Sequence, residues 1–516
     1  MPPSPLAAGE KLYCVSYSPF RGKQSPLDPG IQIDPRQIED DIARLSRLTE
    51  CVRTYSTRNG LDRVPEIAAR HGMKVMQGIW LGGDRAAQER DVAAAVSLAK
   101  RHPQVIRSVV VGNEVLLRGE MTPAELTATI RRVKAEITQP VTYADVWEFW
   151  LRYREVYPAV DFVTIHILPY WEDFPIPARA ASAHVEAIRR KVATALPEKE
   201  ILLGETGWPS AGRMREGASP SPVNQARVLH DVLNLAKREG YHVNVIEAFD
   251  QPWKRRLEGT VGGHWGLLDA VRREPKFAWG MALSNHPRWP LQAAAGILFA
   301  VLVFAAALSA TRGKVPDIPD PVWFGVAAMA LGPGILIGRA IANVPIESLT
   351  AGDWLRSLTM VALALAAPLL GAAALVRGDR VPSFARLLGA RPVWRQPVLE
   401  AALGLSLMLL CVVALQVALG LVFDPRYKDF PFAPLTAAAI PYFVLELIRR
   451  RFNSDAERKI FRADIAESAF AALLGACSVY ILFNEGFANW QAVWLTAVFV
   501  ALALVLLRPR AAPDST

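Results

Sequence analysis

The stretch RSVVVGNEVLLRGE, residues 107–120, ends a short apolar run on two polar residues. Three consecutive valines are typical of a buried strand, and Asn113 and Glu114 follow them after a single glycine. A carboxylate at the end of a buried strand is either a polar cap for a neighbouring loop or an acid placed for chemistry. One strand cannot distinguish these alternatives, but the rest of the chain offers further strands that can.

Short apolar runs of this kind recur through the first half of the chain, and amphipathic stretches such as 35–48 and 221–240 lie between them. The second of these stretches begins at Ser221 and ends at Gly240, which are typical start and stop signals of a helix. Eight strands, each followed by a helix or long loop over about 270 residues, predict an α/β fold, the TIM (β/α)8 barrel. A doubly wound open sheet is the alternative, but no Gly-rich phosphate loop follows the first run. The runs are LYCVSY (12–17), CVRTYS (51–56), KVMQGIWL (74–81), RSVVVGNE (107–114), PVTYADV (140–146), DFVTIHI (161–167), EILLGET (200–206) and HVNVIEAFD (242–250).

The second half of the chain has a different composition. From Leu291 onward, long apolar runs alternate with short Arg-rich loops, which is the pattern of a polytopic membrane protein. We therefore predict a barrel domain at residues 1–285 and an all-α membrane domain of about seven transmembrane helices at residues 286–516. The candidate spans are 291–310, 322–341, 354–376, 398–423, 433–448, 467–484 and 490–507, and the fifth, which is short and contains two prolines, is the weakest.

The distribution of Lys and Arg predicts the orientation of these spans, because cytoplasmic loops are enriched in both. The loops 342–353 and 484–489 contain neither residue, so the C-terminus should be cytoplasmic and the barrel outside the cytoplasm. The start of the chain shows no apolar signal region, and a count of six or eight spans would place the barrel in the cytoplasm instead. The basic residues that set this orientation are Arg377, Arg380, Arg386, Arg391, Arg395, Arg449, Arg450, Arg451, Arg458, Lys459, Arg462, Arg508 and Arg510.

Charge and cysteine content exclude some functions. The net charge of +9 comes largely from the membrane loops, and no basic patch with interleaved aromatic residues favours nucleic acid as a partner. The four cysteines, Cys14, Cys51, Cys411 and Cys477, show neither a metal-binding spacing nor a visible disulfide framework.

The active site of a TIM barrel lies at the C-terminal ends of its strands, where this sequence gathers acids and aromatic rings. Glu114 ends the fourth strand, Glu205 ends the seventh, and Glu247 lies at the end of the eighth. Glycosidases need such a pair, because one carboxylic acid protonates the departing oxygen while a second carboxylate attacks the sugar. Flat aromatic faces stack on sugar rings. The other candidate residues at these strand ends are Asn113, Tyr55, Trp80, Trp147, Trp150, His166, Tyr170, Trp171, Trp253 and Lys254.

Two motifs carry a resemblance to a known family. GNE (112–114) and GETGWPS (204–210) resemble glycoside hydrolase family 17, the β-1,3-glucanase family, and the resemblance covers about residues 11–285. Four further strings are similar to the bacterial branch, whose members are often joined to membrane segments and linked to β-(1,3),(1,6)-glucan synthesis. These strings are ADVWEFW (144–150), TIHILPYWED (164–173), EAFDQPWK (247–254) and HWGLLD (264–269).

The resemblance implies a role for individual residues. Glu114 matches the proton donor, Glu205 the nucleophile, and Asn113 the residue that hydrogen-bonds the sugar 2-hydroxyl. Tyr170 is expected near the nucleophile, and Trp208 is expected to line the sugar cleft. The family's geometry implies retention of configuration, with carboxyl groups about 5–5.5 Å apart, and needs no metal or organic cofactor.

The eighth strand departs from the family pattern. Plant-type members carry an acid after FD, where this chain has Gln251, although Lys254 is kept. Glu247 could replace that acid, or it could be a buried salt-bridge partner of a barrel arginine such as Arg53.

These features predict a retaining hydrolase or transglycosylase that acts on β-1,3-glucan at a bacterial inner membrane, with the barrel on the periplasmic or extracellular side. The expected partners are the β-glucan, the lipid bilayer and a glucan synthase that docks on the membrane domain. Transfer that forms β-1,6 linkages is one expectation, with Trp147 and Trp150 as candidates for the acceptor surface. The alternatives are a catalytically inactive glucan-binding scaffold or exporter subunit, and a transporter gated by the barrel. The lack of mid-span charges disfavours the transporter.

Overall fold

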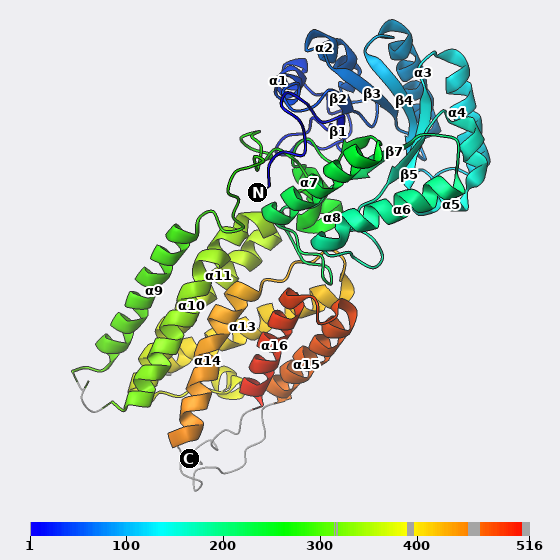
Figure 1. The fold of residues 1–516 in the computed structure, drawn as a ribbon. Coiled ribbons are helices and arrows are strands. Elements are labelled where there is room, and N and C mark those ends of the chain that lie inside the picture. The colour runs from blue at the N-terminus through cyan, green and yellow to red at the C-terminus, as the bar shows by residue number, and fades with distance from the viewer. Residues whose placement is uncertain (1, 314, 316–317, 390–396, 453–464, 508–516) are drawn as a thin grey trace. The chain divides into compact units, whose positions relative to one another are not determined.

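The computed structural model of this chain describes residues 2–313, 315, 318–389, 397–452 and 465–507. By their contacts, the residues form two compact units (Figure 1). The first comprises Met1–Gly212 and Gly217–Asn285, and the second Arg213–Glu216 and His286–Thr516. Each unit has its own hydrophobic core.

The first unit contains a closed barrel of eight parallel strands, which confirms the predicted fold. The strands pair in sequence order, and β8 pairs with β1 to close the cylinder. Seven of the predicted apolar runs contain a whole strand, and the remaining run, 107–114, contains all of β4 except its first residue, Ile106. The strands are β1 (Cys14–Ser16), β2 (Cys51–Arg53), β3 (Lys74–Ile79), β4 (Ile106–Asn113), β5 (Val141–Val146), β6 (Val163–His166), β7 (Ile201–Thr206) and β8 (Val243–Val245).

Helices follow the strands and pack their apolar faces on the outside of the barrel (Figure 1). The start and stop signals of α7 act as predicted, since the Ser221 side chain accepts a hydrogen bond from Asn224 N and Gly240 adopts a left-handed conformation. The helices are α1 (Pro35–Leu45), α2 (Val64–Arg70), α3 (Arg85–Arg101), α4 (Pro123–Glu136), α5 (Trp147–Arg152), α6 (Ala181–Ala195), α7 (Pro222–Glu239) and α8 (Arg255–Gly262).

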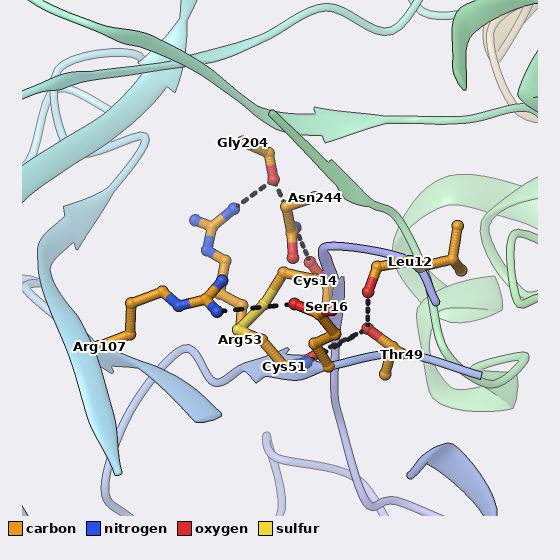
Figure 2. Close-up of a disulfide and its surroundings, with 10 residues drawn as sticks. Leu12, Cys14, Ser16, Thr49, Cys51, Arg53, Arg107, Gly204 and Asn244 are labelled. Carbon is orange, nitrogen blue, oxygen red and sulfur yellow. Dashed lines mark hydrogen bonds and ion pairs between the residues drawn. A yellow bond between two sulfur atoms is a disulfide. The ribbon is translucent and has the colours of Figure 1, made fainter. Parts of the chain in front are cut away.

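A disulfide joins Cys14 to Cys51 inside the barrel (Figure 2). No disulfide framework is visible in the sequence, because the two cysteines are 37 residues apart and show no spacing signature. The parallel register of β1 and β2, which pairs Val15 with Val52, is what places them side by side. Both cysteines are fully buried, and they cluster with Met76, Val110, Ala144 and Leu202 in an apolar layer, here called the lower layer.

The second unit contains a helix at each of the seven predicted spans (Figure 1). Five of them, α9, α10, α11, α13 and α15, are long and apolar enough to cross a membrane. The apolar parts of α14 and α16, residues 432–448 and 490–506, are shorter. The helices of this unit are α9 (Trp289–Ala310), α10 (Asp320–Glu347), α11 (Ala351–Arg377), α12 (Phe384–Leu388), α13 (Val398–Phe423), α14 (Phe432–Phe452), α15 (Ile465–Glu485) and α16 (Trp490–Leu506).

Large apolar side chains cover the outer faces of these helices, and Phe324, Ile335 and Phe483 are examples that are largely exposed. A soluble helix turns such residues inward, whereas a helix in a bilayer can present them to lipid. The orientation of the spans stays a prediction, because many of the basic residues that would set it lie outside the described residues. These are Arg391, Arg395, Arg458, Lys459, Arg462, Arg508 and Arg510.

Candidate active site

The two predicted carboxylates lie together at the C-terminal ends of their strands. Glu114 directly follows β4, and Glu205 is the second-last residue of β7. One oxygen of each carboxylate and one ring nitrogen of His166 all lie within 4.8 Å of one another. The Glu114 side chain is 24% exposed and that of Glu205 is 7% exposed, so both border the barrel mouth.

Arg53 and Tyr55 fix the position of Glu205. The Tyr55 hydroxyl donates a hydrogen bond of 2.7 Å to Glu205 Oε1, and Arg53 Nη1 lies 3.4 Å from the same oxygen. The guanidinium also donates to the Gly204 carbonyl at 2.8 Å and to Asn113 Oδ1 at 2.5 Å. Because Arg53 is 1% exposed, these bonds satisfy a charge that would be costly to bury alone. Arg53 therefore ties β2, β4 and β7 together beneath the mouth.

His166 lies between the two carboxylates. Its Nδ1 is 2.8 Å from Glu114 Oε1, and its Nε2 is 3.4 Å from Arg53 Nη1. A guanidinium only donates hydrogen bonds, so Nε2 accepts and Nδ1–H donates to Glu114. Burial raises the pKa of Glu114, but the hydrogen bond from His166 and the charges of Arg118 and Arg53 outweigh burial and hold the pKa below its ordinary value.

The backbone at Glu114 is unusual. Glu114 has a left-handed φ of 53°, and Gly112 before it has a φ of 88°. A left-handed conformation costs a non-glycine residue about 1–2 kcal/mol, so other contacts must hold it. Glu114 N donates to the Ala144 carbonyl on β5 at 2.8 Å, and Arg118 N donates to the Glu114 carbonyl at 2.9 Å. This turn points the carboxyl group of Glu114 toward His166.

Glu247 forms a buried ion pair with Lys254, whose Nζ lies 2.8 Å from Glu247 Oε2. The alternative partner, Arg53, is excluded because it contacts Glu205 instead. Burial raises the pKa of Glu247 despite the charge of Lys254, and the negative charge of Glu205 adds to this shift. For Lys254, burial lowers the pKa, but the charges of Glu247 and Glu258 outweigh burial and raise it. Gln251 donates to the Ser18 carbonyl at 2.9 Å.

Two of the three fully buried aromatic candidates donate their indole N–H to a backbone carbonyl. Trp208 is fully buried, and its indole N–H donates to the Ser219 carbonyl at 3.0 Å. Trp150 is also buried, and its N–H donates to the Thr164 carbonyl at 2.9 Å. The expectations that Trp208 lines the sugar cleft and that Trp150 forms an acceptor surface are therefore wrong, because both rings are packed in the barrel core.

The remaining aromatic candidates fall into two groups. Tyr170 is fully buried, and its ring lies edge-on to the rings of Trp171, Trp208 and Trp265. The other group is only partly buried. Its members are Tyr55, Trp80, Trp147, Trp171 and Trp253.

The sequence reasoning missed Arg53 and Ser16 as parts of the site. Ser16 Oγ accepts a hydrogen bond from Asn244 Nδ2 at 2.8 Å and lies 3.0 Å from the Tyr55 hydroxyl. Ser16 and Arg53 each lie two residues after a cysteine whose side chain faces the barrel interior, a direction that only the structure reveals. Side chains two residues apart on a strand share a face.

Glu114, His166 and Glu205 each offer a donor atom that a metal ion could use. The guanidinium of Arg53, which contacts both Glu205 and His166, would place a like charge beside such an ion. The same three groups suit a reaction that moves a proton and forms a bond to a carboxylate, and this chemistry needs no metal.

Comparisons with known proteins relate the first unit to glycoside hydrolases. Residues 14–266 match the family model of the BtgE/BtgC glycoside hydrolase domain. A glucan 1,3-beta-glucosidase of Candida albicans is 27% identical over 263 residues, which cover 46% of this chain and 85% of that protein. A glucan 1,3-beta-glucosidase of Saccharomyces cerevisiae is 27% identical over 253 residues, which cover 45% of this chain and 80% of that protein.

Solved structures that are similar to this chain include a glycoside hydrolase family 17 beta-1,3-glucanosyltransferase from Rhizomucor miehei. It is 25% identical, and the match covers 51% of this chain and 95% of that chain with a TM-score of 0.46. Residues 14–266 therefore form a glycoside hydrolase domain of the BtgE/BtgC type, similar to glucan 1,3-beta-glucosidases.

Proposed function

We propose that this chain is a retaining enzyme that cleaves and rebuilds β-1,3-glucan, with Glu114 as acid and base and Glu205 as nucleophile. The observation that carries this proposal is the closeness of the two carboxylates, whose nearest oxygens lie within 4.8 Å. Retaining glycosidases hold their carboxyl groups about 5–5.5 Å apart, whereas inverting enzymes leave about 6.5–9.5 Å for a water molecule. The short separation supports direct attack by one carboxylate.

In the first step, Glu205 attacks the anomeric carbon as the glycosidic C–O bond breaks. Glu114 gives its proton to the departing oxygen, which leaves as a free hydroxyl. Arg53 binds Asn113 Oδ1, so the amide N–H groups of Asn113 are the part of this side chain that can donate to a sugar hydroxyl. The product is a glycosyl ester of Glu205.

In the second step, a hydroxyl group attacks the same carbon and Glu205 leaves as a carboxylate. Glu114, now ionised, takes the proton of the attacking hydroxyl. Water as the attacking group gives hydrolysis, and a second sugar gives transfer. The partly buried rings of Tyr55, Trp80, Trp147, Trp171 and Trp253 support transfer, because an acceptor that stacks on them gains a high effective concentration over water. Transfer to a primary hydroxyl would form the β-1,6 linkage.

Two observations support the proposed location. Five helices of the second unit are long and apolar enough to cross a membrane, which supports a multi-pass membrane domain at residues 286–516 after a catalytic domain at residues 1–285. The Cys14–Cys51 disulfide supports a catalytic domain outside the cytoplasm, because cytoplasmic thiols are mostly kept reduced. A glucan synthase in the same membrane is the partner that would supply the substrate.

The orientation can be tested in spheroplasts that produce the full chain with a C-terminal reporter. Protease added outside should remove the barrel, while the reporter should be active only in the cytoplasm. Full protection of the barrel would place the enzyme on the cytoplasmic side.

The activity is tested with the purified full chain in detergent and linear β-1,3-gluco-oligosaccharides. Nuclear magnetic resonance of the first product should show the β-anomer, and mass and linkage analysis should show products longer than the substrate. An α-anomer as the first product would exclude the retaining mechanism. Binding without any turnover would favour the inactive scaffold.

A further inference from the structure

The general acid needs a backbone that holds its carboxyl group at the glycosidic oxygen. Residues 114–119 form a tight turn in which Glu114 has its left-handed conformation. Two hydrogen bonds inside this turn run from Gly119 N to Leu116 O at 3.1 Å and from Glu120 N to Val115 O at 3.1 Å. A third bond, from Arg118 N to the Glu114 carbonyl at 2.9 Å, holds the start of the turn, and none of the three bonds uses the N–H of Leu116.

Tyr143 on β5 supplies the partner of this N–H. Its hydroxyl accepts a hydrogen bond of 3.0 Å from Leu116 N, two residues after the acid. The same hydroxyl donates to Asp145 Oδ2, and Asp145 Oδ1 accepts from Val146 N at 2.7 Å. A hydroxyl has one proton, so its donation to Asp145 directs its lone pairs toward Leu116.

Both side chains of this relay are fully enclosed in the barrel wall. Tyr143 is 1% exposed and Asp145 is fully buried. Burial raises the pKa of Asp145 to about 6, and the hydrogen bond from Tyr143 opposes this rise. Enclosed groups of this kind cannot touch a sugar, so Tyr143 acts on the reaction through the turn it holds, and Asp145 acts through Tyr143 and through its charge near Glu114.

We propose that Tyr143 and Asp145 are positioning residues for the general acid, which they serve by anchoring the Leu116 N–H. This inference rests on the proposed role of Glu114. Removing the Tyr143 hydroxyl would leave a buried N–H without its partner, and the turn would relax to satisfy it. A misplacement of about 1 Å can cost about 10²-fold in rate, and general acid catalysis is worth about 10²–10⁴-fold.

The test uses the dependence of the rate on the leaving group. The full chain in detergent is assayed with aryl β-laminaribiosides whose leaving groups range from phenol to 2,4-dinitrophenol, and kcat/KM is measured for each. For Tyr143→Phe, kcat/KM should fall about 30–100-fold for the substrate with a phenol leaving group. It should fall less than about 3-fold for the substrate with a 2,4-dinitrophenol leaving group, which needs no proton to depart. Asp145→Asn should change in the same direction by a smaller factor. A merely structural role would lower kcat/KM by the same factor for every substrate, and that result would overturn the inference.

Two further variants calibrate the result. Glu114→Gln must show a steep dependence on the leaving group; a flat dependence would mean that Glu114 is not the acid and that the proposed function fails. A steep dependence for Glu114→Gln with a flat one for Tyr143→Phe would overturn the inference alone. Tyr241→Phe is a control that changes another buried tyrosine, which precedes β8 at the opposite end of the barrel. This variant should have the same kcat/KM as the parent chain for every leaving group. If Tyr143→Phe does not fold, Asp145→Asn decides by the same criterion.

Discussion

The two ends of the barrel interior differ although the same strands build both. The lower layer holds the Cys14–Cys51 disulfide among apolar side chains. Two residues further along β1 and β2, Ser16 and Arg53 begin a polar layer that includes Glu205, and this set is here called the upper layer. In Figure 2, Arg53 and Asn244 both reach the Gly204 carbonyl beyond the disulfide.

The difference separates stability from chemistry. Apolar contacts and a covalent bond in the lower layer favour the folded state directly. The upper layer instead buries charges whose desolvation is costly, and their mutual hydrogen bonds only offset that cost. We therefore expect changes in the upper layer to remove activity and leave the fold, and changes in the lower layer to do the reverse.

The largest effect is expected for Glu205→Gln in the upper layer. Glutamine keeps the volume of the side chain but cannot form the glycosyl ester, so kcat should fall by about 10⁴-fold or more. The circular dichroism spectrum should stay the same, and the melting temperature should not fall, because the change removes a buried charge whose desolvation is costly. Activity close to that of the parent chain would show that another group is the nucleophile.

The lower layer is tested with the double variant Cys14→Ser and Cys51→Ser. Loss of a disulfide that closes a loop of 37 residues should reduce the free energy of unfolding of the barrel by about 3–4 kcal/mol. The urea concentration that abolishes activity measures this loss, while kcat in the absence of urea should stay within about 2-fold. An unchanged urea midpoint, or a large fall in kcat with the fold intact, would break the division between the layers.

His166→Leu tests the electrostatics of the upper layer through the pH profile. The hydrogen bond from His166 holds the pKa of Glu114 below its ordinary value, whereas burial acts in the opposite direction. Without His166 the pKa of Glu114 should rise, so Glu114 should stay protonated to higher pH. The alkaline limb of kcat/KM should therefore move to higher pH, and an unmoved limb or a move to lower pH would contradict this account.

The smallest effect is expected at the rim above the upper layer. Trp147 is partly buried, and replacing it with alanine should lower the ratio of transfer to hydrolysis by about 3-fold while cleavage continues. Product analysis at millimolar oligosaccharide measures this ratio. Trp150→Phe is the control three residues away; Trp150 is buried, so this change should leave the ratio unaltered. Equal ratios in both variants would remove Trp147 from the acceptor surface.

Much of the fold could be predicted because periodicity and hydropathy are local properties. The eight strands and the helices at the seven spans lie where the apolar runs predicted them. The meeting of Glu114 and Glu205 also followed, because both lie at the same end of parallel strands.

Features that depend on register or side-chain direction could not be predicted in this way. The disulfide needs the pairing of β1 with β2, which no spacing reveals. Trp208 follows the nucleophile closely in sequence, yet its indole N–H binds a backbone carbonyl inside the core. Arg53 was considered only as a partner of Glu247, because its reach to Asn113 and Glu205 joins three strands that are distant in sequence.

The most direct test of the central claim is to trap the covalent intermediate. The full chain in detergent is incubated with 2,4-dinitrophenyl 2-deoxy-2-fluoro-β-laminaribioside, whose fluorine slows the second step more than its leaving group slows the first. Peptide mass spectrometry then locates the attached sugar. The account predicts one sugar on Glu205, within the peptide that contains GETGWPS (204–210). A sugar on any other carboxylate, or normal turnover of the oligosaccharide substrate without any trapped ester, would contradict it.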